Sequence, residues 1–90
     1  MAIDFPTMTD SQPPLPGAPY GRVRKRSLTV AGHATSISLE DAFWSELRRL
    51  ADVQGRPLAD LVATIDDARG EANLSSALRL YVIAAIKSGM

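Results

Sequence analysis

The 90 residues suffice for one small domain, and ten basic side chains balance ten acidic ones, so the formal net charge is zero and gives no general argument for nucleic-acid binding. The absence of cysteine excludes disulfide bonds and cysteine-containing metal sites, and it fits a reducing cytoplasm, which is the expected location. The longest apolar run, from Leu80 to Ile86, is far shorter than the roughly 20 residues of a membrane-spanning helix, and the first residues lack the pattern of a secretory signal.

Residues 1–21 are predicted to form a disordered, proline-rich leader. They contain five of the six prolines, and such a composition buries too little apolar surface to order the chain. A more specific interpretation is a segment that binds a protein partner, because Pro13-Pro14-Leu15-Pro16 can adopt a polyproline II helix and because Phe5 and Tyr20 can dock on a partner. The folded part is then residues 22–90, which is small enough that self-association is expected to add stability.

Four of the ten basic residues lie within five positions at the start of the predicted domain: Arg22, Arg24, Lys25 and Arg26. A run of like charge is usually a solvated stretch of chain. Here the run directly precedes a predicted strand, so it is also a candidate arm for binding phosphate groups. Both interpretations stay open at this point.

Two short segments after the basic arm, residues 27–30 and 35–39, show the alternation that is typical of β-strands. Residues 31–34 between them predict a turn, in which Gly32 supplies a permissive backbone. The two segments are therefore expected to form a hairpin, with a single irregular extended arm as the alternative. The residues expected on the inner face are Leu28, Val30, Ile37 and Leu39, and those expected on the outer face are Ala34, Ser36 and Ser38.

A first helix is predicted over residues 40–54. Ser38, followed three residues later by Asp41, is expected to cap its N-terminus, and Gly55 fits its C-terminal end. Trp44, the single tryptophan, is expected in the core or in a dimer interface. It belongs to an apolar stripe at helical spacing that consists of Phe43, Trp44, Leu47, Leu50 and Ala51.

Two further helices are predicted, one from Pro57 to just before Gly70 and one over residues 74–88 with Asn73 as its N-cap. The third helix is apolar on more than one side, because Leu80 and Ile83 lie off the face formed by its other apolar residues. A helix of this kind is expected to be covered on two sides. In so small a chain, the second cover is expected to come from another subunit.

No group of side chains indicates catalysis. His33 is the only histidine, and a histidine in a turn is expected to be exposed and without a catalytic role. Asp66, Asp67 and Glu71 form an acidic patch that is expected to be a solvated helix end, because no base, nucleophile or glycine-rich phosphate loop accompanies them. The chain is therefore predicted not to be an enzyme and to need neither a metal nor a cofactor.

The order and spacing of these elements resemble the ribbon-helix-helix family, which includes the Arc, Met and CopG-type repressors. The closer resemblance, over about residues 25–88, is to a bacterial subfamily of small ribbon-helix-helix proteins with a third helix. It implies a mainly α fold with a short β ribbon, an intertwined dimer, an N-terminal hairpin and an extra C-terminal helix. The resemblance rests on Thr35-Ser36-Ile37-Ser38-Leu39, on the helix through Phe43-Trp44, on Gly55-Arg56-Pro57-Leu58, on Arg69-Gly70 and on Asn73-Leu74-Ser75-Ser76-Ala77-Leu78-Arg79.

One alternative register stays open within this resemblance. Residues 73–79 also resemble the second helix of the family, in which case residues 57–69 would be an insertion. The shorter register is preferred because Gly55 and Pro57 lie where the turn between the two family helices belongs.

The resemblance implies that two chains pair their strands into a ribbon that enters the major groove of DNA, while amides at the start of the second helix hold phosphate. Ser36 and Ser38 are then the expected base contacts. Serine discriminates poorly between bases, so the basic arm is expected to carry much of the affinity. The expected contacts to the DNA backbone are Arg22, Arg24, Lys25, Arg26, Arg56 and Leu58, and the expected dimer interface consists of Ile37, Leu39, Trp44, Leu61, Ile65, Leu80 and Ile83.

The function implied first is that of a dimeric DNA-binding protein, a transcriptional regulator that would be associated with the nucleoid. The alternative is a protein-interaction module that keeps the fold and the dimer without reading base sequence, with the leader as its partner-binding arm. An antitoxin, which combines DNA binding with a disordered toxin-binding segment, ranks third, because in this family such segments usually follow the domain.

Overall fold

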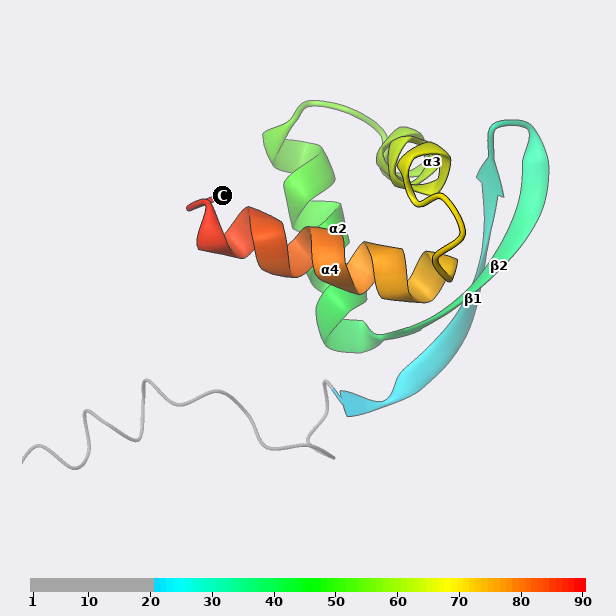
Figure 1. The fold of residues 1–90 in the computed structure, drawn as a ribbon, viewed down its shortest axis with the longest axis horizontal. Coiled ribbons are helices and arrows are strands. Elements are labelled where there is room, and N and C mark those ends of the chain that lie inside the picture. The colour runs from blue at the N-terminus through cyan, green and yellow to red at the C-terminus, as the bar shows by residue number, and fades with distance from the viewer. Residues whose placement is uncertain (1–20) are drawn as a thin grey trace, which may run out of the picture.

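The computed structural model describes residues 21–90, in which a two-stranded sheet is followed by three helices (Figure 1). This agrees with the predicted class, mainly α with a short β ribbon. The predictions for the proline-rich leader, including those for Phe5 and Tyr20, lie outside the described residues. The elements are β1 (Val23–Val30), β2 (His33–Glu40), α2 (Asp41–Val53), α3 (Leu58–Ala68) and α4 (Leu74–Lys87).

The two strands form an antiparallel hairpin, which confirms the predicted hairpin and excludes the irregular extended arm. The pairing extends from Val30 opposite His33 to Val23 opposite Glu40, so both strands are longer than predicted. Most of the basic arm therefore belongs to β1. The alternation signal of the sequence stops at Ser27, but the extended backbone continues because each residue back to Val23 has a partner in β2.

The hairpin turns within two residues, Ala31 and Gly32, whose φ angles of 52° and 84° are both positive. This is the left-handed backbone of the type I′ turn, which matches the twist of the flanking strands. The predicted four-residue turn was too long, because His33 and Ala34 already belong to β2 and pair with β1. His33 is exposed, as predicted.

The start of α2 differs from the prediction. Its N-cap residue is Glu40, no side chain caps the helix there, and Ser38 lies within β2 opposite Lys25. Ser38 cannot act as a cap because strand pairing continues for two residues beyond it. At the other end of α2 the prediction is confirmed. Gly55 has a φ of 66° and, with Arg56, donates backbone hydrogen bonds to the carbonyl oxygens of the last turn, as in a Schellman motif.

The remaining two helices lie close to their predicted bounds. Pro57 is the N-cap residue of α3 rather than its first helical residue, a shift of one position. The predicted cap of α4 is confirmed, because the side-chain oxygen of Asn73 accepts a hydrogen bond from the backbone N–H of Ser76 at 3.2 Å.

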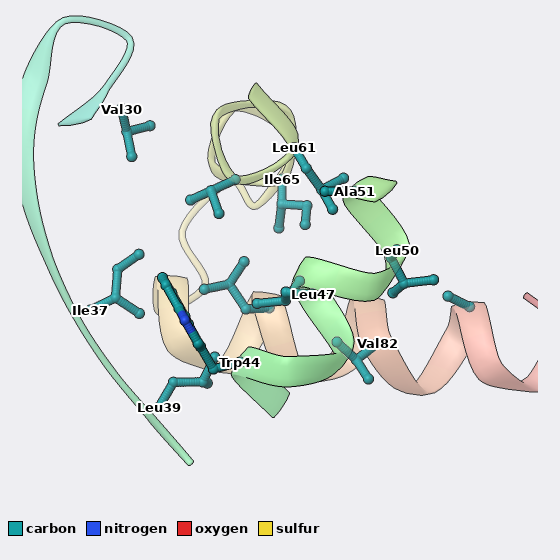
Figure 2. Packing of buried hydrophobic residues seen from close by; sticks show 13 residues of the cluster. Val30, Ile37, Leu39, Trp44, Leu47, Leu50, Ala51, Leu61, Ile65 and Val82 are labelled. Carbon is teal, nitrogen blue, oxygen red and sulfur yellow. The ribbon is translucent and has the colours of Figure 1, made fainter. Parts of the chain in front are cut away.

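The inner face of the hairpin and all three helices meet in one hydrophobic core (Figure 2). Ile37 and Leu39 extend from β2 toward Trp44, which is only 8% exposed. Each element contributes at least one buried side chain to this core. The core residues are Val30, Ile37, Leu39, Trp44, Leu47, Leu50, Ala51, Leu61, Val62, Ile65, Leu78, Val82 and Ala85.

Candidate nucleic-acid interface

The hairpin has two chemically different faces. Residues directly opposite each other in an antiparallel pair point to the same side, and successive residues alternate between sides. The inner face packs on the helices and carries the apolar residues. The outer face is exposed along its whole length and carries mostly small polar side chains, together with one lysine, one valine and one alanine. Its residues are Val23, Lys25, Ser27, Thr29, Ala34, Ser36 and Ser38.

Both predicted base-contact residues lie on this outer face. Ser36 is opposite Ser27, and Ser38 is opposite Lys25, so the two strands present their hydroxyl groups side by side. Ser27 and Thr29 were not predicted as site residues, although the alternation of Leu28 and Val30 already indicated their direction. The side chain of Ser38 is exposed, and its carbonyl oxygen accepts a hydrogen bond from the hydroxyl group of Ser75 at 2.7 Å.

The strand geometry divides the basic arm between the two faces. Arg24 and Arg26 are opposite Leu39 and Ile37 and therefore point toward the inner side. Both approach the carboxylate of Asp41 in the first turn of α2, Arg26 at 2.6 Å and Arg24 at 3.5 Å. Two of the predicted phosphate contacts are thus already paired with an acidic side chain of the same chain.

Arg26 is held most firmly of the four basic residues. Its guanidinium group lies over the ring of Trp44, 4.9 Å from the centroid, and its side chain is only 27% exposed. Its Nε is enclosed without a hydrogen-bond partner among residues 21–90. This arginine therefore covers the edge of the core and links the hairpin to α2.

Lys25 is the only basic residue that β1 places on the outer face. Lys25 and Arg22 are both exposed, and neither forms a salt bridge within residues 21–90. Arg22 precedes the strand, where its carbonyl oxygen accepts a hydrogen bond from the N–H of Asp41. These two cations are the part of the basic arm that is available to an external anion.

The N-terminal end of α4 contacts β2. Ser75 in its first turn donates to Ser38, and Arg79 binds the carboxylate of Glu40 at 2.8 Å. The predicted phosphate-binding residues of the turn before α3 lie elsewhere. Arg56 donates hydrogen bonds to the side of α3, at Asp60 and Thr64, and Leu58 begins a helix that packs against β1.

The carboxyl group of Glu40 marks the junction of ribbon and helices. Its hydrogen bond from Arg79 lowers the pKa of Glu40 below its ordinary value, while partial burial acts in the opposite direction. Glu40 is therefore charged at neutral pH. The guanidinium group of Arg79 also lies near the ring of Phe43, 5.9 Å from the centroid, so this pair fixes α4 against the start of α2.

The predicted dimer-interface residues fall into two groups. Ile37, Leu39, Trp44, Leu61 and Ile65 are buried in the core of the single chain. Leu80 and Ile83 on α4 are instead 68% and 43% exposed, so their apolar surface remains available to another molecule. The interface itself stays a prediction for both groups.

Other types of site find little support in the described part of the chain. Residues 21–90 contain no cluster of three potential metal ligands of the histidine, aspartate or glutamate type. Asp66 of the acidic patch pairs with Arg69. None of the helices in this range has the length and the apolar character needed to cross a membrane.

A curved hairpin whose polar face is exposed, followed by helices that cover its apolar face, defines a small ribbon-and-helix domain. The profile of the family described as "Ribbon-helix-helix domain" matches residues 23–86, and the chain belongs to this family. The predicted resemblance is thereby confirmed. Members are typically DNA-binding regulators or antitoxins and are generally not enzymes. No curated protein and no solved structure matches the chain significantly.

Proposed function

We propose that the protein is a dimeric DNA-binding protein, acting as a transcriptional regulator, that applies the outer face of its hairpin to the major groove. The observation that carries the proposal is the exposed polar face on an antiparallel two-stranded ribbon. The major groove is about 12 Å wide and admits two strands side by side. The small side chains of this face allow the backbone to approach the base edges closely.

In this proposal the two chains join through β2. One edge of β2 pairs with β1, and its other edge has no partner strand within residues 21–90. Pairing of this edge with β2 of a second copy gives a sheet of four strands. Because strands lie about 4.8 Å apart, the outer strands of such a sheet are roughly 14 Å from each other, which exceeds the groove width.

The two central strands then face the bases, and the two copies of β1 lie along the walls of the groove. This places the hydroxyl groups of Ser36 and Ser38 toward base edges and Lys25 toward the phosphate groups. Hydroxyl groups bind several bases, so sequence discrimination is modest and the lysines contribute a salt-dependent affinity. The first turn of α4, beside Ser38, supplies backbone amides to a phosphate group.

Binding selection on fragmented genomic DNA at two salt concentrations is the direct test. Fluorescence anisotropy on a selected duplex then compares Lys25→Gln with Arg48→Gln. Arg48 is the matched control, since it is an exposed cation of α2, outside the hairpin, without a salt bridge among residues 21–90. Lys25→Gln is expected to raise the dissociation constant roughly tenfold in low salt and to lower the salt slope by about one per lysine removed.

Replacement of Ser36 by alanine is expected to change the preference between duplexes rather than the affinity for all of them. Absence of duplex binding by the wild-type protein in low salt would refute the proposal. Equal losses in the Lys25→Gln and Arg48→Gln variants would also contradict it, because binding would then follow total charge rather than the ribbon face.

The second candidate function is a protein-interaction module of the same fold that does not read base sequence. The observation that favours it is the pairing of Arg24 and Arg26 with Asp41, which halves the number of basic residues that the arm offers to DNA. It predicts a stoichiometric protein partner and no enrichment of any DNA sequence in the genomic selection. A defined operator would exclude it.

A further inference from the structure

An apolar groove lies between the C-terminal half of α3 and the first half of α4. It has a volume of about 410 Å³. Its lining is mainly aliphatic, with the ring of Tyr81 as an aromatic surface and with Thr64 and Arg69 as polar members. The aliphatic members are Ile65, Ala68, Ala72, Ala77 and Leu80. Because Leu80 is 68% exposed, residues 21–90 leave apolar surface of this groove uncovered.

The hydroxyl group of Tyr81 is a hydrogen-bond donor at this groove. Its oxygen accepts a hydrogen bond from Nε2 of Gln54 at 2.7 Å, and its own proton has no acceptor within residues 21–90. The guanidinium group of Arg69, in contrast, already donates to the carboxylate of Asp66 and to the carbonyl oxygen of Ala72. An apolar surface with a hydroxyl donor suits an apolar segment that offers carbonyl acceptors without N–H donors, as proline does.

A segment of the leader has this composition. Residues 13–16 are Pro13-Pro14-Leu15-Pro16, so three of the four lack a backbone N–H and the fourth has a leucine side chain. A polyproline II helix has no internal hydrogen bonds, which leaves its carbonyl oxygens available to a donor. Proline-rich segments bind to apolar grooves with aromatic side chains, and they lose little conformational entropy because proline already restricts the free chain.

The packing of α4 on the hairpin brings the start of β1 close to the groove. Arg79 binds the carboxylate of Glu40 at 2.8 Å, and Glu40 is opposite Val23 in the hairpin. Tyr81 follows Arg79 by two positions. The path from Val23 around α4 to the groove is therefore roughly 20 Å long, from the spacing of strands and the diameter of a helix. Residues 13–16 precede Val23 by seven to ten positions, and a proline-rich chain of that length spans about 20–30 Å.

We propose that residues 13–16 occupy this groove of their own chain, with Leu15 beside Leu80 and with the hydroxyl group of Tyr81 donating to a proline carbonyl oxygen. A linker whose length matches the distance gives an effective concentration in the millimolar range, so even a weak contact is formed most of the time. The proposal does not depend on DNA binding, because the groove and the outer face of the hairpin share no residue. A protein partner of the leader has to compete with this contact.

A pair of engineered cysteines tests the contact in the full-length protein, which has no cysteine of its own. Leu15→Cys with Leu80→Cys is expected to form a disulfide bond within one chain, and the rate is followed on denaturing gels. Adding Ala68→Glu, which places a charge in the groove, is expected to slow this reaction roughly tenfold. Adding Ala84→Glu is the matched control, because Ala84 is an exposed residue of α4 outside the groove, and it is expected to leave the rate unchanged.

Two results of this experiment would overturn the proposal. Equal rates in the presence of Ala68→Glu and of Ala84→Glu would show that the bond forms by chance encounters of a tethered chain. Chains that become linked to each other instead of closing on themselves would assign the groove to a second copy.

Nuclear magnetic resonance tests the same contact without cysteines. In the full-length protein, Leu15→Asp is expected to shift the methyl signals of Leu80, because the leader leaves the groove. Thr9→Asp adds the same charge to the leader outside the proposed segment and is expected to leave these signals in place. Unchanged Leu80 signals in Leu15→Asp would refute the contact.

The role of the hydroxyl group is tested with Tyr81→Phe. This exchange is expected to lower the equilibrium constant for docking roughly fivefold, as for the loss of one hydrogen bond, which the methyl signals of Leu80 report. Gln54→Ala is the control, because it removes the same hydrogen bond within the domain and keeps the hydroxyl donor. Equal effects of the two exchanges would contradict donation from Tyr81 to the leader.

Discussion

Asp41 determines how many cations of the basic arm remain unpaired. Its single carboxylate lies at the first turn of α2, where a negative charge also interacts favourably with the helix dipole. It attracts Arg24 and Arg26 to the inner side of the hairpin and holds Arg26 against Trp44. The same residue therefore stabilises the domain and removes cations from the candidate DNA surface.

The exchange Asp41→Asn is expected to change stability and DNA affinity in opposite directions. Loss of the ion pairs and of the favourable dipole interaction lowers the free energy of unfolding by about 1 kcal/mol. Release of Arg24 and Arg26 raises the affinity for duplex DNA several-fold in low salt. Urea unfolding followed by Trp44 fluorescence measures the first effect, and fluorescence anisotropy measures the second.

Glu46→Gln is the control for this exchange, because Glu46 pairs with Arg49 elsewhere on α2. It is expected to leave the DNA affinity unchanged and to alter the stability by less than about 0.5 kcal/mol. If Asp41→Asn lowers both the DNA affinity and the stability, the ion pairs of Asp41 orient Arg24 and Arg26 for DNA binding instead of keeping them away from DNA.

At the scale of elements, the hairpin turn contains one residue that is unfavourable in a type I′ turn. Ala31 adopts a positive φ, for which an L-residue with a Cβ atom has no intrinsic preference, whereas Asn-Gly is the favoured pair in a type I′ turn. Ala31→Asn is therefore expected to raise the free energy of unfolding by about 0.5–1 kcal/mol. Ala34→Asn introduces the same side chain at an exposed strand position and is expected to be neutral or slightly destabilising. Equal effects of the two exchanges in urea unfolding would contradict the explanation.

The sequence predicted those elements whose signals are local. Asn73 caps α4 with its own side chain, and Gly55 ends α2 through its own backbone, so neighbouring residues suffice to recognise both. The cap assigned to Ser38 was wrong, because pairing with β1 competes with capping and depends on residues more than ten positions away. Local patterns contain no information on such a competition.

For the candidate site, too, the sequence predicted only the features that depend on neighbouring residues. The outward direction of Ser36 and Ser38 follows from alternation within β2. The sequence could not predict that Lys25 lies on the outer face and that Arg24 and Arg26 lie on the inner face, because nothing in a run of basic residues shows that it forms a strand. Likewise, the contact between Ser75 and Ser38 joins residues that are 37 positions apart and needs the packing of α4 on the ribbon.

At the scale of the whole molecule, the core draws on every strand and helix of the described chain. Its buried residues lie between Val30 and Ala85 of one chain, and α4 covers α2 without help from a second copy (Figure 2). We therefore expect the proposed association through β2 to add to a fold whose core one chain already forms.

On dilution, the protein is expected to dissociate into single chains that stay folded. Trp44 reports on the core, because it is the single tryptophan and is almost fully buried. As the protein is diluted and its mass falls to that of one chain, the emission of Trp44 is expected to stay at the wavelength of a buried indole. A shift to longer wavelength that coincides with dissociation would show that folding and assembly are coupled.

The position of β1 also bears on how the protein avoids aggregation. In the proposed pairing of two β2 strands, β1 remains an edge strand, and an edge strand offers unpaired backbone groups to other chains. Three consecutive positively charged residues, Arg24, Lys25 and Arg26, lie in this strand. Two such edges repel each other, so the basic run protects the sheet against indefinite growth, independently of any nucleic acid.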